Sequence, residues 1–168
     1  EPEQKVEREN TLITFRNVTG DSPIRLDFDA TPAGGLPDGW VLSEKGNLVW
    51  NTDATMLFVA TKEQEDELED WPEGGLPLAD VNIWHWADDR IQSQQEQSAS
   101  RDRNRTYVAA ADVERGTVVP LTDESMRSAE ITRDGRWAIG RDETEYVSDW
   151  QPDLADYYRL DKTGRAHV

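Results

Sequence analysis

Five turns of two kinds alternate along this chain, and their order limits the folds that it can adopt. Three turns place polar residues and a glycine between extended segments, at residues 17–20, 112–116 and 161–164. Two others are centred on aspartate and join an aromatic-containing segment to an apolar one, at residues 50–55 and 131–136. The second of these contains an Asp-Gly pair, a strong short-range signal for a β-hairpin. This regular succession of hairpins predicts an all-β fold built from repeated units.

Segments typical of β-strands flank these turns, because they are rich in β-branched and aromatic residues. They are residues 11–17, 23–28, 40–43, 48–50, 56–61, 107–112, 117–121, 129–132, 137–140 and 155–161. Residues 56–61 (MLFVAT) are mostly apolar without alternation, so we expect a strand that is buried on both faces.

The spacing of matching turns is typical of a four-stranded propeller blade. The interval from Gly116 to Gly164 is close to the length of one blade, and the interval from Gly20 to Gly116 is twice as long. The interval from Asp53 to Gly116 is also longer than the matching interval from Asp134 to Gly164. The additional residues fall within residues 62–106. We therefore expect a β-propeller of four-stranded antiparallel blades, one of them decorated. A β-sandwich is the alternative, but it would leave the alternation of turn types accidental.

The predicted organisation is an incomplete ring of about two and a half blades. Residues 1–10 are expected to form a polar, frayed leader, and residues 11–168 a partial propeller. Its parts are an outer hairpin of one blade (11–28), the decorated blade (40–121) with its insertion (62–106), and the next blade (129–168). Closed propellers need about 4–8 blades. We therefore expect a fragment of a longer protein, with assembly of several copies into one ring as the alternative.

The insertion has two parts of different character. Residues 62–80 carry many carboxylates, two prolines and a glycine pair, and we expect an acidic surface excursion there. Residues 87–105 have almost no apolar side chains, with acids at the start and arginines at the end. This distribution complements a helix dipole, so it predicts a polar surface helix.

The charge of the chain argues against several kinds of partner. There are 35 acidic and 18 basic residues, for a net charge of −17. Nucleic acids and anionic membrane surfaces need a basic face, so neither is expected as a partner. No run is long and apolar enough for membrane insertion, and the lack of cysteine excludes disulfides and thiolate sites. Only four basic residues are lysine, a balance that fits either adaptation to high salt or simply an acidic soluble protein.

Four common catalytic motifs are absent from the sequence. It has no G-x-S-x-G nucleophile elbow, P-loop, dinucleotide fingerprint or H-E-x-x-H motif. The two histidines are His85 and His167, and no catalytic residue, cofactor or metal site is predicted. Neighbouring carboxylates such as Asp88 and Asp89 are expected on a solvated acidic face.

One aromatic cluster is the best candidate for a functional surface. It comprises Trp84, His85 and Trp86, followed by Asp88, Asp89 and Arg90. One interpretation is a wall at a substrate passage or a partner surface. The other is an aromatic plug over the apolar strands, because aromatic side chains bury large areas and favour strands.

A resemblance to a known family rests on the same region. Residues 80–95 (DVNIWHWADDRIQSQQ) resemble the decorated blade of bacterial prolyl oligopeptidase family serine peptidases, which have a long N-terminal β-propeller. Residues 49–58 are similar to the family's blade hairpin, W-S-x-D-G-x-x-L-x-F, with Asn51 in place of serine and Ala54 in place of glycine. Residues 107–121 and 131–140 resemble the strands that follow.

This resemblance implies a role in substrate access. In such enzymes the propeller covers a separate α/β-hydrolase domain, which carries the catalytic serine, and it admits peptides but not folded proteins. The chain alone would then be non-catalytic, and its partners would be the remaining blades, the hydrolase domain and a peptide substrate. Acidic residues within 63–73 could favour basic peptides. A periplasmic or secreted location is favoured over a cytoplasmic one.

Two other functions stay open at this point. One is a non-enzymatic propeller that binds a protein or peptide, and the other is a secreted carbohydrate-binding β domain that uses exposed tryptophans. The reading frame beyond Val168 would separate the first from the peptidase, because only the peptidase requires a following G-x-S-x-G motif.

Overall fold

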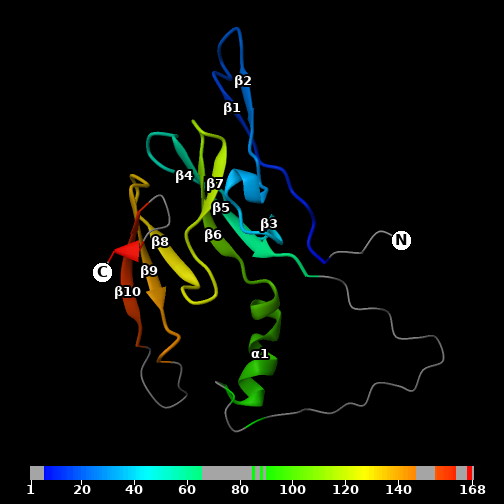
Figure 1. The fold of residues 1–168 in the computed structure, drawn as a ribbon, viewed down its shortest axis with the longest axis vertical. Coiled ribbons are helices and arrows are strands. Elements are labelled where there is room, and N and C mark those ends of the chain that lie inside the picture. The colour runs from blue at the N-terminus through cyan, green and yellow to red at the C-terminus, as the bar shows by residue number, and fades with distance from the viewer. Residues whose placement is uncertain are drawn as a thin grey trace, which may run out of the picture.

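The described part of the molecule is mostly β-structure with one α-helix (Figure 1). The computed structural model describes residues 6–65, 85, 88, 90–146, 154–161 and 166–167. Its strands form three antiparallel sheets. The prediction of a predominantly β fold with one polar helix is therefore confirmed at this level.

The central sheet is a meander around the long strand β5. It contains β3 (Trp40–Leu42), β4 (Val49–Trp50), β5 (Met56–Glu63), β6 (Tyr107–Asp112) and β7 (Thr117–Pro120). Both β3 and β4 pair with β5, on the side away from β6, so that these two short strands share one edge. Counted across its width, the sheet is four strands wide.

The second sheet is a simple four-stranded meander. It contains β8 (Ser128–Ile131), β9 (Trp137–Asp142), β10 (Asp156–Asp161) and β11 (Ala166–His167), each paired antiparallel with the next. A separate hairpin of β1 (Ile13–Arg16) and β2 (Ile24–Asp27) projects at the top of the view in Figure 1. The β1–β2 and β8–β9 hairpins lie where the turn signals predict them.

The core lies on both faces of β5, as the unbroken apolar run predicts. Leu57 and Val59 belong to a cluster on one face, shared with N-terminal residues that include Leu12 and Phe28. The residues that alternate with them in the strand, including Phe58, belong to a second cluster, which contacts β8. Each fully buried apolar side chain contributes about 1.5–3 kcal/mol. The central sheet is therefore stabilised from two sides, by the N-terminal segment and by the second sheet.

The two aspartate-centred turns have the same hydrogen-bond pattern. In the first turn, the amide of Asn51 donates to Met56 O and the amide of Ala54 donates to Asn51 O. The corresponding bonds in the second turn join Thr132 to Trp137 and Gly135 to Thr132. Ala54 and Gly135 also share a positive φ, of 52° and 65°. The same interval in sequence separates the members of every matching pair, so the two turns are structurally equivalent.

The strand register shows where the two units differ in length. Met56 lies opposite Asp112, and the equivalent Trp137 lies opposite Asp161. The chain between the first pair is more than twice as long as the chain between the second pair. The first unit therefore has its additional residues between β5 and β6, which agrees with the insertion predicted within residues 62–106.

The glycine turns are less alike than the sequence suggests. In residues 112–116 the left-handed position is Gly116, with φ of 70°, whereas in residues 17–20 it is Asn17, with φ of 53°. The third such turn, at 161–164, lies largely outside the described residues. The repeat is therefore carried by the aspartate-centred turns.

The expectation of a frayed leader is wrong for residues 6–10. Glu7 is buried, and its carboxylate accepts hydrogen bonds from Lys62 Nζ (2.5 Å) and Lys45 Nζ (2.9 Å). Gln64 exchanges two hydrogen bonds with the backbone of Glu7, and Asn10 donates to Leu42 O. Because buried charges must be paired, this polar segment is fixed against the end of β5.

The helix α1 (Gln92–Arg103) lies below the central sheet in Figure 1 and is polar on nearly every side. Its last turn carries Arg101 and Arg103, as predicted, but its first turn holds no acidic residue. Ser98 is its one buried residue. Within the described residues, no helix is long and apolar enough to cross a membrane.

The tryptophans do not all contribute to packing. Trp40 is half-buried and its ring lies 5.0 Å from that of Tyr107. Trp50, in contrast, is 46% exposed, although its position in a blade hairpin suggests packing. Both tryptophans lie in edge strands beside β5, but of the two only Trp40 has a described ring contact, with Tyr107 of β6.

Candidate functional site

The predicted aromatic surface is only partly within the described structure. Trp84, Trp86 and Asp89 lie outside the described residues. His85 and Asp88 are exposed, and they form a small turn in which the His85 amide donates to Asp88 Oδ2 (2.8 Å). Asp88 and Arg90 line a cleft, whereas His85 is not among the residues that line it.

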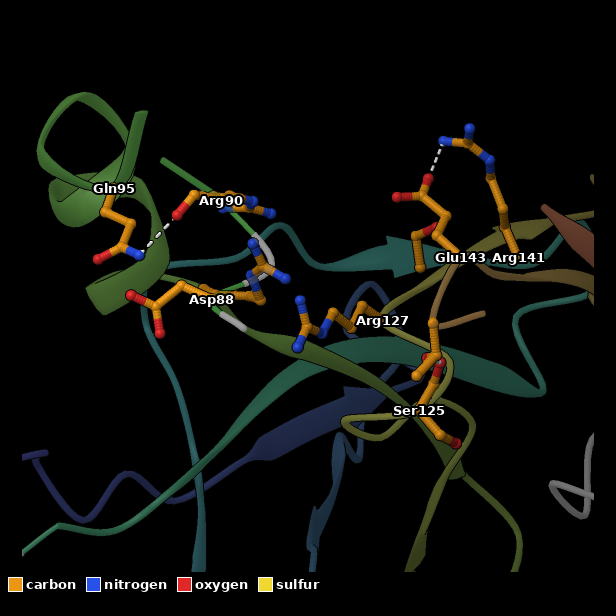
Figure 2. Close-up of a pocket in the computed structure, with 10 residues that line it drawn as sticks. Asp88, Arg90, Gln95, Ser125, Arg127, Arg141 and Glu143 are labelled. Carbon is orange, nitrogen blue, oxygen red and sulfur yellow. Dashed lines mark hydrogen bonds and ion pairs between the residues drawn. The ribbon is translucent and has the colours of Figure 1, made fainter. Parts of the chain in front are cut away.

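This cleft has a volume of about 630 Å³ and opens between the α1 region and the second sheet (Figure 2). Its lining comprises Asp88, Arg90, Gln95, Arg105, Ser125, Arg127, Ser128, Arg141, Glu143 and Thr144. The volume is within the range of about 300–1,000 Å³ found for ligand pockets. We call it the arginine cleft after its four guanidinium groups.

Two of the arginines are fixed by one aspartate of the helix. Asp102 accepts hydrogen bonds from Arg105 Nη2 (2.6 Å) and from Arg90 Nη1 (3.2 Å). It also accepts from Ser98 Oγ at 2.7 Å, and this bond is the main cause of the lowered pKa of Asp102, followed by the bond from Arg105. The Arg90 carbonyl accepts from Gln95 Nε2, as Figure 2 shows. The segments before and after α1 are thereby held together.

The other two arginines come from the second sheet and the loop that leads into it. Arg127, in the loop before β8, donates through Nε to Glu124 O (3.1 Å). Within the described residues, its two terminal nitrogens have no partner. Arg141, on β9, pairs with Glu143, but its Nε is buried and has no hydrogen-bond partner in the described structure. In Figure 2, Arg127 extends across the cleft toward Asp88, and the Arg141–Glu143 pair lies on the other side.

The charge of the cleft is opposite to that of the molecule. Four arginines and two carboxylates line it, whereas the whole chain carries −17. Guanidinium groups bind carboxylates and phosphates through two parallel hydrogen bonds. The arrangement is therefore suited to binding an oxyanion. No group of three or more acidic or histidine side chains in the described residues is placed to hold a metal ion.

Sequence reasoning identifies Asp88 and Arg90 but misses the other arginines of the cleft. Arg90 and Arg141 are far apart in the sequence, and no motif connects them. The preference for arginine over lysine, 14 against 4, was an available signal. It points to oxyanion recognition as readily as to salt adaptation.

Comparisons of this chain with protein-family models and with curated proteins find no match.

Proposed function

We propose that this chain forms part of a β-propeller that controls peptide access to a prolyl oligopeptidase-type serine peptidase, and that it is not catalytic by itself. The observation that carries the proposal is the equivalence of the two aspartate-centred turns. Their hydrogen bonds and their positive-φ positions match, with the same interval in sequence between all matching residues. Repeated four-stranded meanders of this kind are the building units of propellers.

The contact between the two units supports the same proposal. Thr52 of the first turn donates to Arg133 O of the second through its hydroxyl (2.9 Å) and its amide (3.3 Å). Asn51 Nδ2 donates to Asp134 O at 3.4 Å. Equivalent turns thus lie side by side. A circular array of blades produces this relation between neighbours.

The outer face of the second sheet supports further blades as partners. Ile139 is 47% exposed and Tyr157 is 67% exposed. The pairing of Arg141 with Tyr157 places Tyr157 on the same face as Ile139. The opposite face carries the buried Ala138 and Leu160. A neighbouring blade would cover the exposed face as the second sheet covers the central one.

The coding sequence after Val168 tests the proposal. We expect it to continue through further blades into an α/β-hydrolase domain with a G-x-S-x-G motif, followed by aspartate and histidine. A stop codon directly after Val168 would contradict the peptidase. The whole protein should cleave a short peptide but leave intact a folded protein that contains the same peptide sequence. A serine-to-alanine change in the G-x-S-x-G motif should abolish cleavage.

A non-enzymatic propeller that binds peptides is the second candidate. The arginine cleft favours it, because a binding site within this chain needs no catalytic domain. The two candidates differ in hydrolysis, which the same peptide assay measures.

A further inference from the structure

The arginine cleft concentrates positive charge in a chain that has little of it. Of the 18 basic residues, four line this one cleft. Grouping like charges costs free energy unless opposite charges or a ligand compensate it. The four guanidinium groups differ in whether a carboxylate of the chain neutralises them.

A structural role accounts for two of them. Arg90 and Arg105 both bind Asp102, and these ion pairs hold the two ends of α1 together. Their remaining donors still line the cavity. Their positive charge would attract an anionic ligand, but their ion pairs with Asp102 keep both side chains in place.

Arg127 is exposed and has no ion pair in the described residues, whereas Arg141 is paired with Glu143 and leaves only its Nε unsatisfied. In the described residues, Arg127 donates only through Nε, and its terminal nitrogens have no acceptor. The buried Nε of Arg141 likewise has none. An unsatisfied buried donor is unfavourable, because it has lost its hydrogen bonds to water. Because Arg141 lines an open cavity, a bound ligand could supply the missing acceptor for its Nε.

We propose that the arginine cleft binds an acidic peptide, through at least two of its carboxylates. The guanidinium groups are spread across the cavity, with Arg90 on one side, Arg127 in the middle and Arg141 on the other side (Figure 2). Separated cationic groups match a ligand with separated charges better than one compact anion. The Ser128 hydroxyl lines the same cavity, where it can donate to a peptide carbonyl. The hydroxyls of Ser125 and Thr144 already donate to Asp123 Oδ1 and to Ser125 O, so they can only accept from peptide amides. Such binding does not require the sheets to belong to a propeller.

The test is direct binding to the 168-residue chain. The probe is a fluorescein-labelled peptide of six glutamates, with six glutamines as the uncharged reference, measured by fluorescence anisotropy at about 0.15 M salt. We expect binding of the glutamate peptide and none of the glutamine peptide. Arg127→Gln should weaken binding about tenfold, equivalent to about 1.4 kcal/mol, because it removes a charged hydrogen-bond donor from the cleft. Arg127→Lys should retain only part of the affinity for the glutamate peptide, since lysine keeps the charge but lacks the planar guanidinium group.

The matched control is Arg115→Gln, which removes the same charge from an exposed turn outside the cleft. It should change the affinity less than twofold, and thermal melts should show that both variants remain folded. Equal weakening by Arg115→Gln would overturn the proposal in favour of unspecific attraction. Failure of the glutamate peptide to bind would also overturn it. If inorganic phosphate displaces the glutamate peptide when both are present at the same concentration, the cleft binds a compact oxyanion instead.

Discussion

Gly135 occupies a left-handed turn position whose equivalent in the other unit is an alanine. Its φ is 65°, and a Cβ added there would lie 2.5 Å from Asn51 Cβ. We expect Gly135→Ala to lower the free energy of unfolding by about 2 kcal/mol or more, because strain and a steric clash add. Chemical denaturation measures this change.

The reverse substitution at the equivalent position of the first turn should raise the free energy of unfolding. Ala54 has a φ of 52° and is exposed. Ala54→Gly relieves the left-handed strain and should raise the free energy of unfolding by about 0.5 kcal/mol after the entropic cost of glycine. Destabilisation by Ala54→Gly would contradict the equivalence of the two turns.

The buried carboxylate of Glu7 should make stability depend on pH. Hydrogen bonds from Lys62 and then Lys45 lower the pKa of Glu7 below its ordinary value of 4.5. Its contribution is therefore complete above about pH 4.5 and is lost as the pH falls through the lowered pKa. We expect Glu7→Gln to cost about 3 kcal/mol at pH 7, because two lysines lose their buried partner.

Urea denaturation at a series of pH values measures this effect. The difference between the unmodified protein and Glu7→Gln should narrow as the pH falls below 4.5. Glu114→Gln, which removes an exposed carboxylate from the β6–β7 turn, should change stability by less than about 0.5 kcal/mol at every pH. A gap that stays constant down to the acid transition would show that Glu7 acts through packing alone.

At the scale of elements, α1 is held by ion pairs at its ends more than by packing. Ser98 is its one buried residue, and Asp102 connects Arg90 before the helix with Arg105 after it. Asp102→Asn should speed hydrogen exchange of the α1 amides about fivefold, as expected for losing partly exposed ion pairs of about 0.5–1 kcal/mol. Exchange in β5 and β6 should not change.

Gln97→Ala is the control for this prediction, because Gln97 is an exposed residue of the same helix. It should leave exchange in α1 unchanged or slower, since alanine is the better helix former. If Asp102→Asn instead accelerates exchange in the sheets, the helix is part of the cooperative core.

The individual elements were more predictable than their contacts. Residues 131–136 contain an Asp-Gly pair, and residues 56–61 are apolar, so local chemistry alone indicates a hairpin and a buried strand. Glu7 is different, because a glutamate in a charged segment is typical of solvent-exposed chain. Its burial depends on Lys45 and Lys62, which are distant in sequence and meet it only in the folded state.

At the scale of the whole molecule, the outer face of the second sheet should cause self-association. Ile139 and Tyr157 are exposed on the outer face of this sheet, next to the partly buried Arg141. The net charge of −17 opposes association at low salt, and about 1 M salt screens it. We expect sedimentation of the unmodified chain to show oligomers at high salt, and Ile139→Lys to reduce them without changing the free energy of unfolding.

Val18→Lys provides the matched control, because Val18 is 71% exposed at the tip of the β1–β2 hairpin rather than on this face. It should leave association unchanged. Equal sedimentation of the unmodified chain and Ile139→Lys would show that this face does not recruit another sheet.

The arginine cleft could not be predicted from the sequence as a site. Its residues come from α1 and the segments on either side of it, from β8 and the loop before it, and from β9 and the residues after it, and only the fold brings these together. In the sequence, Asp88 and Arg90 stand out only because they follow an aromatic cluster, and nothing there links them to Arg127 or Arg141. What the sequence does indicate is the shortage of lysine, which leaves arginine as the cation available for such a site.

The burial of β5 on both faces has a consequence for strand alignment. A shift by one residue normally exposes the apolar side of a strand, and this penalty sets the register. In β5 such a shift would exchange one apolar face for another, so hydrophobicity alone discriminates weakly. Asn51 binds the amides of Thr55 and Met56 at one end, and Glu7 binds Lys62 at the other. Polar anchors at its two ends thus fix the alignment of a strand that is buried on both faces.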